Sequence, residues 1–386
     1  MTNKLSRKEF LNLGLGTLAG LGAIGLHSTL NSNAAIAATQ QRDFSVAGTA
    51  SLKERAAAKG IIYGGTVIQD LLQDKEFAKS IIQECGIITS EWDFKWSAGG
   101  KGLRQRPDMF DFTGSDAIVN FAQTNGLLVR GHTLVWHESL PRWFKSVVTK
   151  DNAEAILEEH ITKVVGRYAG RMHSWDVVNE AINLSNKRSD GLGASPWLDL
   201  LGPNYIRLAF QLAAVADPNA LLVYNDYGLN YDTSDAAKKR TAVLKMLENL
   251  LSKDTPIHAV GIQAHLSPEN PFTPRKLKSF IRDIDKMGLK VMISEMDVID
   301  QKLPGELVQR DNIVANTYED YLSVVLEEKA VIAVSNWGLS DRYTWLSEYR
   351  RRDDGNLVRP LPLDYYMQRK LAWYAMAKAF DKVEKR

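Results

Sequence analysis

From about residue 60 onward, short apolar runs alternate with amphipathic stretches, and no Pro/Ser-rich linker or internal repeat interrupts the alternation. Several of the apolar runs are hydrophobic on consecutive positions, which is typical of strands that are covered on both faces, as in parallel sheets. The pattern predicts eight strands, over residues 61–67, 87–92, 127–136, 173–179, 221–226, 259–266, 290–297 and 332–339.

Helical patterns fall between these runs. One has an apolar stripe at spacings of four, three and four, formed by Leu157, Ile161, Val164 and Tyr168. Asp151 and Glu154 precede that stripe in the pattern of a capping box, which predicts the start of the helix. A second stripe is formed by Leu277, Ile281 and Ile284, and Gly288 follows it as a C-terminal stop.

Eight strands alternating with helices most simply close into an α/β structure of the (β/α)8, or TIM-barrel, type. We expect a single catalytic domain over residues 51–382, preceded by a short segment at 39–50. A doubly wound open sheet is the structural alternative, but no Gly-x-Gly-x-x-Gly follows the first predicted strand. In a barrel, the loops after the C-terminal ends of the strands converge on one bowl, so chemistry is expected there.

Composition is that of a globular protein, with 45% hydrophobic and 24% charged residues among 386. The 48 basic and 46 acidic residues are interspersed and give a formal net charge of +2. This balance does not suggest a nucleic-acid partner. We expect a monomer with no membrane contact once an N-terminal signal has been removed.

The N-terminus predicts an export signal over residues 1–38. A basic start leads into a Gly-rich apolar stretch up to Leu30, and the small residues 35–37 resemble a cleavage pattern. The start also resembles a twin-arginine signal in which Lys8 replaces the second Arg, so the twin-arginine and general routes both stay open. The alternative is a membrane anchor, but the apolar run is short and interrupted. We therefore expect an exported protein, periplasmic or extracellular.

Cys85 is the only cysteine, so an internal disulfide is excluded. It lies in a mostly apolar stretch before Gly86, where a small buried hydrophobic residue is expected rather than a nucleophile. The sequence has no cluster of Cys and His with metal-ligand spacing, and we predict no metal site.

Two glutamates carry the strongest chemical signal. Glu180 ends the run 175–180, and Glu295 lies in the run 291–297, on the fourth and seventh predicted strands. A carboxyl group at the end of a strand-like apolar run costs stability unless it is used. Cleavage of a sugar–sugar bond needs two such groups, about 5–5.5 Å apart for retention of configuration and about 6.5–9.5 Å apart for inversion. The sequence leaves that distance open.

Groups suited to a sugar surround the pair. Asn179 precedes Glu180, Gln263 and His265 end the sixth predicted strand, and Asp297 follows Glu295 by two residues. A His beside a carboxylate can fix its charge state, and an amide can bond a ring hydroxyl. Each residue alone is more often a turn former or a satisfied core group. Their gathering at successive strand ends favours a site.

These motifs together resemble glycoside hydrolase family 10, the β-xylanases, over nearly all of residues 50–380. The resemblance rests on six blocks in the order found in that family, at residues 131–137, 175–181, 224–227, 261–266, 293–297 and 337–341. It implies an eight-stranded barrel that hydrolyses internal β-1,4 bonds of xylan with retention and without a cofactor. It also implies that Glu180 is the general acid/base and Glu295 the nucleophile.

The resemblance extends to supporting residues. It implies that His265 and Asp297 tune the two acids and that sugars near the cleaved bond meet His132, Trp136, Asn179 and Gln263. Aromatic walls are expected from Trp337 and Trp345, and contacts to the next sugar on the non-reducing side from Glu91 and Lys95.

Departures from the family pattern bear on the substrate. Trp92 follows Glu91 where the family usually has a sugar-binding Asn, and an indole cannot replace the hydrogen bonds of an amide. Gly228 stands where Asn often follows Asp-Tyr, and the usual Lys-Pro-Ala reads Lys-Leu-Ala at 370–372. Two alternatives to a xylanase stay open: a related hydrolase of a β-1,4-glucan, such as cellulose or mixed-linkage glucan, and a barrel that binds xylo-oligosaccharide with little turnover.

Overall fold

A computed structural model describes residues 42–270 and 272–386, so the predicted signal at 1–38 and the first residues of the 39–50 segment lie outside it. The strands in the described part are β1 (Ile62–Val67), β2 (Ile87–Ser90), β3 (Leu128–Val135), β4 (Ser174–Asn179), β5 (Leu221–Asp226), β6 (Ala259–Ile262), β7 (His265–Leu266), β8 (Lys290–Val298) and β9 (Val331–Asn336). The last two residues of the predicted second strand and the last three of the eighth lie in the loops that follow.

The strands close into a parallel barrel. Each strand from β1 to β6 pairs with the next, β6 pairs with β8, β8 with β9, and β9 returns to β1. The short strand β7 continues the direction of β6 and pairs only with the end of β8. The predicted eight-stranded barrel is confirmed, and its closure rules out the open sheet.

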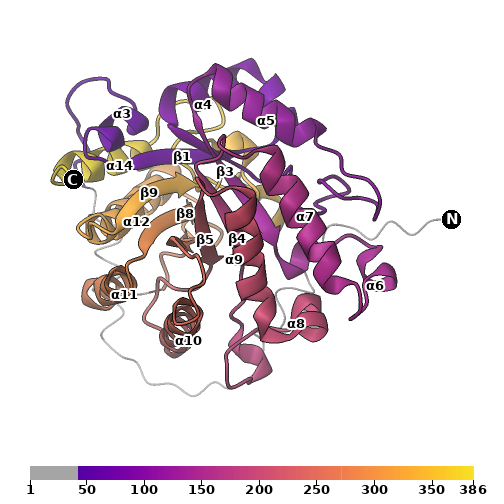
Figure 1. Cartoon of the computed structure of the whole chain (residues 1–386). Helices are drawn as coiled ribbons and strands as arrows, with labels where there is room; N and C mark the ends of the chain where they lie inside the picture. Colours follow the sequence, from indigo (N-terminus) through magenta and orange to yellow (C-terminus); the bar gives the residue numbers. More distant parts are fainter. Residues whose placement is uncertain (1–41, 271) are drawn as a thin grey trace.

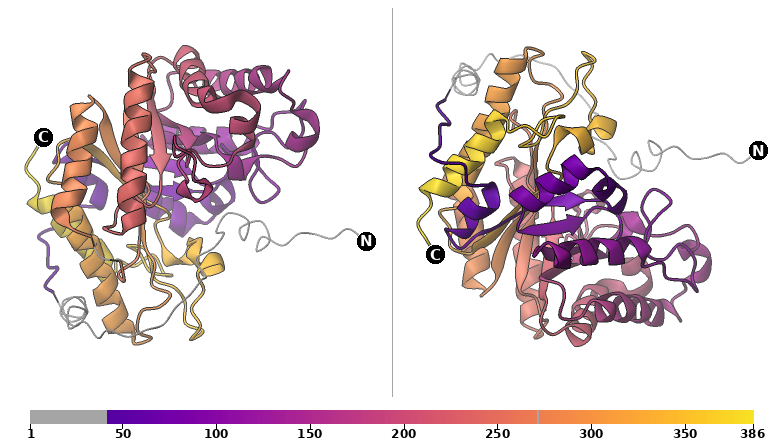
Figure 2. Two further views of the ribbon diagram at one scale, coloured as in Figure 1. Left: turned by 90° about the horizontal axis from the view of Figure 1, so that it is seen from below. Right: turned by 90° about the horizontal axis from the view of Figure 1, so that it is seen from above.

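Helices form an outer ring around the strands, as the three views in Figures 1 and 2 show. They are α3 (Leu52–Ala57), α4 (Lys75–Glu84), α5 (Thr113–Thr124), α6 (Phe144–Val147), α7 (Ala153–Arg167), α8 (Pro196–Leu201), α9 (Tyr205–Ala216), α10 (Ser234–Leu251), α11 (Pro274–Lys286), α12 (Leu307–Val325), α13 (Leu346–Tyr349) and α14 (Leu371–Lys382). The last helix, α14, packs beside α12 and α3, so the two ends of the described chain lie together.

The two helices predicted in detail are present, with one error. All three stripe residues of α11 are buried, and Gly288 follows the helix at φ +80°, as a C-terminal stop requires. The capping box at α7 was wrong. The N-cap is Asn152, and the helix begins two residues after Asp151. The Asn152 side chain accepts a hydrogen bond from Thr149 N–H and does not cap the helix.

The predicted sixth strand is broken. Residues 263 and 264 separate β6 from β7, and Ala264 has φ +60°, a left-handed conformation that ends the extended backbone. Such a residue is strained unless the surroundings hold it. The break redirects the chain at the C-terminal end of the barrel, between two of the predicted site residues.

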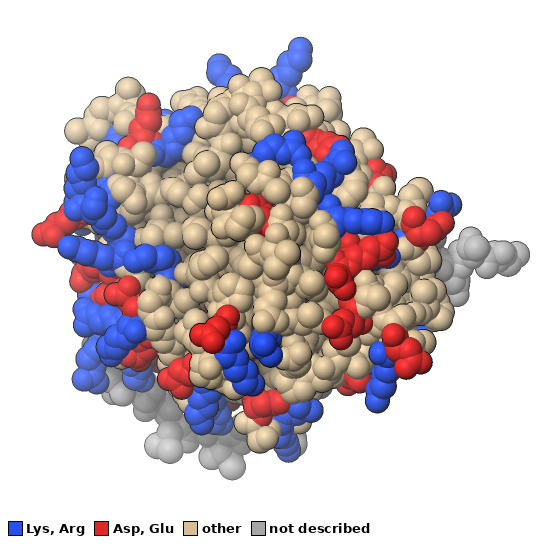
Figure 3. All heavy atoms as spheres, in the orientation of Figure 1, with Lys and Arg blue, Asp and Glu red and all other residues tan. Residues whose placement is uncertain are grey.

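Burial matches the predicted core. Cys85 is fully buried and unpaired, and its pKa is raised by burial and by the charge of Glu84, so it is an inert thiol. Within residues 42–270 and 272–386, no helix combines the length and apolarity needed to cross a membrane. On the face drawn in Figure 3, side chains of both signs surround a largely uncharged centre.

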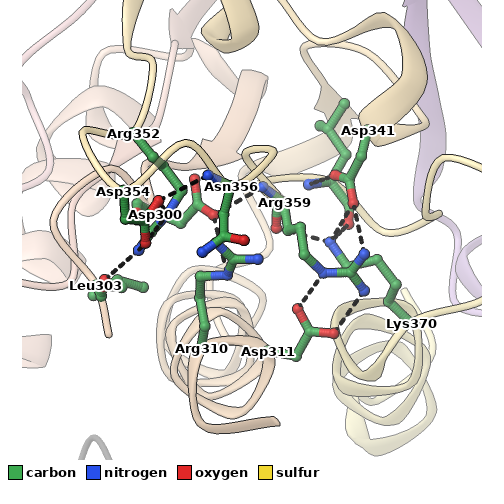
Figure 4. Close-up of polar contacts among 11 residues, drawn as sticks. Asp300, Leu303, Arg310, Asp311, Asp341, Arg352, Asp354, Asn356, Arg359 and Lys370 are labelled. Atoms are coloured by element: carbon green, nitrogen blue, oxygen red, sulfur yellow. Dashed lines mark hydrogen bonds and ion pairs between the residues drawn. The ribbon is translucent and has the colours of Figure 1, made fainter. Parts of the chain in front are cut away.

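The segment that follows β9 is held by one buried and one half-buried ion pair (Figure 4). Lys370 donates to Asp341 at 2.8 Å and to the carbonyl of Leu361 at 2.9 Å. Arg359 binds both carboxylate oxygens of Asp311 on α12, at 2.8 and 2.7 Å. This network fastens residues 340–370 to the barrel and to α12.

Candidate active site

The two glutamates lie at the C-terminal end of the barrel. Glu180 directly follows β4 and has φ +57°, a strained conformation for a residue with a side chain. Glu295 lies within β8, three residues before its end, and is 4% exposed. The backbone N–H of Glu180 bonds to Asn225 and that of Glu295 to Gln263, so neighbouring strands fix both positions.

A chain of amide hydrogen bonds joins the two carboxyl groups. Gln263 Nε2 donates to Glu180 Oε1 at 2.9 Å and lies 3.4 Å from Asn179 Oδ1. Asn225 Nδ2 donates to the same Asn179 oxygen at 2.9 Å and to Glu295 Oε1 at 2.7 Å. Neutral donors therefore fix the relative position of the two acids.

The chain of amide hydrogen bonds requires a glycine at position 261. A Cβ at Gly261 would lie 2.1 Å from Asn225 Oδ1, closer than atoms can approach. Ser294 Oγ donates to that same oxygen at 2.6 Å. Asn225 therefore reaches both Asn179 and Glu295 only because position 261 carries no side chain.

Positive charge surrounds Glu295. His265 Nε2 lies 3.4 Å from Glu295 Oε2, while its Nδ1 is 3.0 Å from Asp297. Burial would raise the pKa of Glu295, but the hydrogen bond from His265 and the charges of His132, His265 and Arg130 outweigh it and lower that pKa to about 2. Glu295 is therefore a carboxylate at neutral pH.

His265 is the counterpart of that carboxylate. Burial opposes its protonation, but Asp297 and Glu295 overcome this and raise its pKa to about 10. Trp345 Nε1 donates to the second oxygen of Asp297 at 2.8 Å, and its ring lies 5.2 Å from that of His265. Trp345, which is predicted to be an aromatic wall, therefore contacts both Asp297 and His265.

Below Glu295 lies a second charged cluster. Arg130 binds both oxygens of Asp176, and His132 Nδ1 lies 2.7 Å from Asp176 Oδ2. His132, Asp176 and Glu295 place possible ligand atoms within 4.8 Å of one another, the one such group among the described residues. The bidentate Arg130 already supplies the positive charge there, so the donor set does not fit a metal cation.

Trp136 and a buried lysine form the side of the site that faces Glu180. Trp136 Nε1 donates to Glu180 Oε2 at 2.9 Å. Lys95 Nζ lies 4.8 Å from the ring centroid of Trp136 and 5.8 Å from that of Trp337. Burial lowers the pKa of Lys95, while the charges of Glu91, Glu295, Glu180 and Glu138 oppose that shift.

A small pocket lies beside Glu180, lined by Trp136, His137, Asn179, Ala181, Ser195 and Tyr205 among others. Glu180 is therefore a half-buried residue beside a pocket, and its carboxyl group has two donors. Together these groups form a site with a buried carboxylate, a second carboxyl group at a pocket, and aromatic walls.

The sequence matches glycosyl hydrolase family 10 over residues 51–379, which covers most of the chain. The chain belongs to this family. Its predicted membership is confirmed, and with it the class of enzyme, a glycoside hydrolase.

Similar family 10 proteins are named as xylanases. A β-1,4-xylanase of Dictyoglomus thermophilum is 36% identical over 303 residues, covering 75% of this chain and 81% of its own length. Xylanase 10B of Thermotoga petrophila RKU-1, solved with xylobiose, has a TM-score of 0.78 at 30% identity and covers 88% of this chain and 99% of its own. Native xylanase 10B of Thermotoga maritima has a TM-score of 0.76 at 31% identity, with 86% and 98% covered.

The structure gathers the predicted family 10 residues at one end of the barrel. Hydrogen bonds, ion pairs or ring contacts join Lys95, His132, Trp136, Asn179, Glu180, Gln263, His265, Glu295, Asp297, Trp337 and Trp345. Glu91 follows β2 at the same end, half-buried, and its charge acts on Lys95. These contacts place the residues and leave their roles as predictions.

Four further residues of the site escaped the sequence predictions: Asn225, Arg130, Asp176 and Glu138. Arg130 and Asp176 are charged residues inside apolar strand runs, a costly pattern that could have marked them. Asn225 lies in one of the six blocks that carry the family resemblance, residues 224–227, but has no chemical signal of its own. Glu138 is recognisable only in the folded chain, where burial and the charge of Glu180 raise its pKa to about 7 against the opposing charge of Lys95.

Proposed function

We propose that this family 10 protein is an endo-1,4-β-xylanase that cleaves internal bonds of xylan with retention of configuration. The observation that carries the proposal is the unequal pair of glutamates. Glu295 is buried and held as a carboxylate by cations, whereas Glu180 is half-buried and bound by two neutral donors beside a pocket. The names of the similar xylanases support xylan as the substrate.

In the first step, a Glu295 oxygen attacks the anomeric carbon of the sugar, and the bond from that carbon to the leaving oxygen breaks. Glu180 gives its proton to that oxygen, so the leaving sugar departs as a neutral alcohol. The covalent bond neutralises the negative charge of Glu295, while His265 and the hydrogen bond from Asn225 hold the attacking group in place.

In the second step, Glu180 takes a proton from water, and the water oxygen attacks the same anomeric carbon. The bond to Glu295 breaks and restores its carboxylate. Two inversions at one carbon return the original configuration. Gln263 and Trp136 keep the Glu180 oxygens oriented in both steps without contributing a charge.

The test is reducing-sugar release from xylan, with the anomer of the first product followed by NMR. We expect rapid release of mixed oligosaccharides in which the β-anomer forms first and then mutarotates. An initial α-anomer would contradict retention, and no release at all would contradict the activity.

The second candidate is hydrolysis of a β-1,4-glucan, which Trp92 favours because an indole stands next to Glu91 where the family usually has an amide. Initial rates on xylan and on soluble β-glucan separate the two candidates. We expect xylan to be the faster substrate. A protein that retains xylo-oligosaccharide but releases no reducing ends from either polymer would instead be a binding barrel.

We also infer that the protein is exported, from the basic, apolar and small-residue regions of its first 38 residues. Expression in a bacterial host and N-terminal sequencing of the protein outside the cytoplasm test this. The expected new N-terminus follows residue 37 or 38. Full-length protein confined to the cytoplasm would contradict it.

A further inference from the structure

Two adjacent tyrosines are unusually exposed in the turn at residues 364–368. The exposed fraction is 45% for Tyr365 and 72% for Tyr366. Their ring centroids lie 5.5 Å apart, and the ring planes meet at 75°. Large aromatic rings normally contribute to stability by being buried, so this pair adds little to the core and leaves ring surface available for a ligand.

The turn that carries the rings is rigid. Asp364 Oδ1 accepts hydrogen bonds from the backbone N–H groups of Tyr366 and Gln368, each at 2.8 Å. Asp364 N–H donates to the Gln368 carbonyl at 2.9 Å, which closes the turn, and Met367 between them has φ +61°. The rings are therefore presented by an ordered backbone, which lowers the entropic cost of binding.

Arg342 fastens the turn from below. Its Nε donates to the Tyr365 carbonyl at 2.7 Å, and its guanidinium lies 5.3 Å from the Tyr365 ring centroid. The same guanidinium binds Asp74 at 2.7 Å and Glu76 at 3.0 Å, in the connection after β1 and the first turn of α4. Tyr365 is thus locked between two parts of the barrel end, while Tyr366 projects further.

The turn belongs to the same end of the barrel as the two glutamates. Ser340, four residues after β9, forms a bridge with Leu363, and its hydroxyl donates to the Asp364 carbonyl at 2.6 Å. Trp337, which contacts His132 in the site, immediately follows β9. The turn with the two tyrosines is therefore attached to the segment that directly follows Trp337, at the same end of the barrel as the site.

We propose that Tyr365 and Tyr366 form a second binding surface for xylan, outside the catalytic site, on which two xylose rings stack. The inference rests on the proposed function for the identity of the polymer. The C–H groups on the faces of a pyranose are apolar and slightly positive, so they are attracted to the negative face of an aromatic ring. Xylan has no charge on its backbone, and the pair offers it ring faces and two hydroxyl groups.

The angle between the rings favours xylan over a flat glucan. Xylose lacks the hydroxymethyl group whose hydrogen bonds flatten cellulose, so successive rings of xylan turn about the chain axis. Two aromatic planes at 75° match such a twisted chain, whereas a flat ribbon would need nearly coplanar rings. The surface therefore discriminates between the two polymers by shape.

The test is native gel electrophoresis in the presence of soluble xylan or of hydroxyethyl cellulose. All proteins carry Glu295→Gln, so that the polymer is not cut. We expect xylan to retard the parent protein and the double variant Tyr365→Ala/Tyr366→Ala to bind about fivefold more weakly. Tyr366→Trp, which keeps a ring, should restore retardation. Tyr374→Ala, which removes a 36%-exposed tyrosine from α14, should leave it unchanged.

A second measurement uses the active protein. The double variant should keep its rate on an aryl xylobioside, which is too short to leave the site, and lose a few-fold in rate on long xylan. Equal retardation of parent and double variant, or an equal loss with hydroxyethyl cellulose, would overturn the proposal. So would self-association that the double variant abolishes, since the tyrosines would then bind a second copy. Failure of the xylanase proposal would instead appear as inactivity of the parent on both substrates.

Discussion

Glu295 and Glu180 lie at the two ends of one chain of amide hydrogen bonds, yet their surroundings differ in charge and in exposure. Around Glu295, His265, His132 and Arg130 supply positive charge, and the carboxylate is 4% exposed. Around Glu180, the indole of Trp136 and the amide of Gln263 donate without carrying charge, Lys95 lies against the Trp136 ring and forms no ion pair with Glu180, and a small pocket adjoins the residue.

This difference in surroundings is what the two proposed tasks require of acids of the same chemical type. A nucleophile needs a permanent negative charge, which fixed cations provide. A general acid/base has to exchange a proton in each cycle, so a fixed cation beside it would hinder protonation, whereas neutral donors orient it in both states.

The largest expected effect is on turnover, and it distinguishes the two glutamates because it depends on the leaving group of the substrate. Glu295→Ala should lower turnover by about ten-thousandfold or more on both xylan and an aryl xylobioside, because no nucleophile remains. Glu180→Ala should be equally severe on xylan but much milder in cleaving an aryl xylobioside, whose phenolate leaves without a proton. Steady-state rates of both variants on both substrates measure this.

Circular dichroism and thermal melting of the same variants provide the control, since both should remain folded. Equal losses on the aryl substrate would break the assignment of different roles. Near-normal rates on xylan in both variants would break the proposed function itself.

The next effect concerns the cation beside Glu295. His265→Ala should lower kcat by about a hundredfold, because Glu295 and Asp297 lose their shared counter-charge. The pKa of His265 is raised to about 10, so its contribution to folding stability is fully present below its unfolded value of about 6.5 and is lost as pH rises through 10. The gap in melting temperature between wild type and variant should therefore shrink from pH 6.5 to pH 10.

Asp297→Asn is the matched variant, because it keeps the shape of the side chain while removing its charge, and its single amide oxygen can accept from only one of the two donors, Trp345 and His265. It should reproduce part of the loss and move the pH dependence to lower values. A gap in melting temperature that is independent of pH would mean that His265 is only a packing residue.

A third change tests the link between the two regions. Gly261→Ala introduces a Cβ 2.1 Å from Asn225 Oδ1, so Asn225 must move away from both Asn179 and Glu295. We expect a destabilisation of roughly 1–3 kcal/mol and a rate loss of about tenfold. Gly166→Ala, in open space near the end of α7, is the control: it should leave the rate unchanged and should not destabilise the fold, since alanine favours a helix more than glycine does. Chemical unfolding and kcat/KM measure the two effects, and an unchanged rate would show that the amide chain is dispensable.

The smallest expected effect concerns Glu138, whose pKa is raised to about 7 by burial and by the charge of Glu180. Once ionised, it adds negative charge near Glu180. Glu138→Gln removes that charge at nearly constant shape, so the alkaline limb of kcat/KM should move to lower pH by less than about one unit. A superimposable pH profile would show that Glu138 is electrostatically silent.

Much of the fold could be predicted from the sequence because periodicity depends on local spacing. Strand β5 has the predicted bounds, and the buried stripe of α11 follows directly from its helical spacing. The break at Ala264 could not be predicted, since its left-handed conformation is imposed by neighbouring strands and not by its own preference. The predicted cap at Asp151 failed for a similar reason, because Asp151 and Asn152 offer equivalent local chemistry and the helix begins after Asn152.

The site was predictable where residues have chemical signals in known motifs, as for Glu180 and Glu295. Asn225 was not singled out, because an asparagine at a strand end is common and its value lies in reaching two partners across the barrel. Glu138 required knowledge of its distance from Glu180, which only the folded chain supplies. Pairwise proximity, rather than residue type, was the missing information.

The buried pair of Asp341 and Lys370 has a consequence for behaviour in acid. Burial raises the pKa of Asp341 to about 6, against the lowering effect of Lys370, so the folded chain takes up a proton there more readily than the unfolded chain does. Between pH 6 and about 3.8, this uptake increases the free energy of unfolding instead of decreasing it. Acidification that destabilises many enzymes rich in carboxylates should therefore not weaken the attachment of residues 340–370 to the barrel.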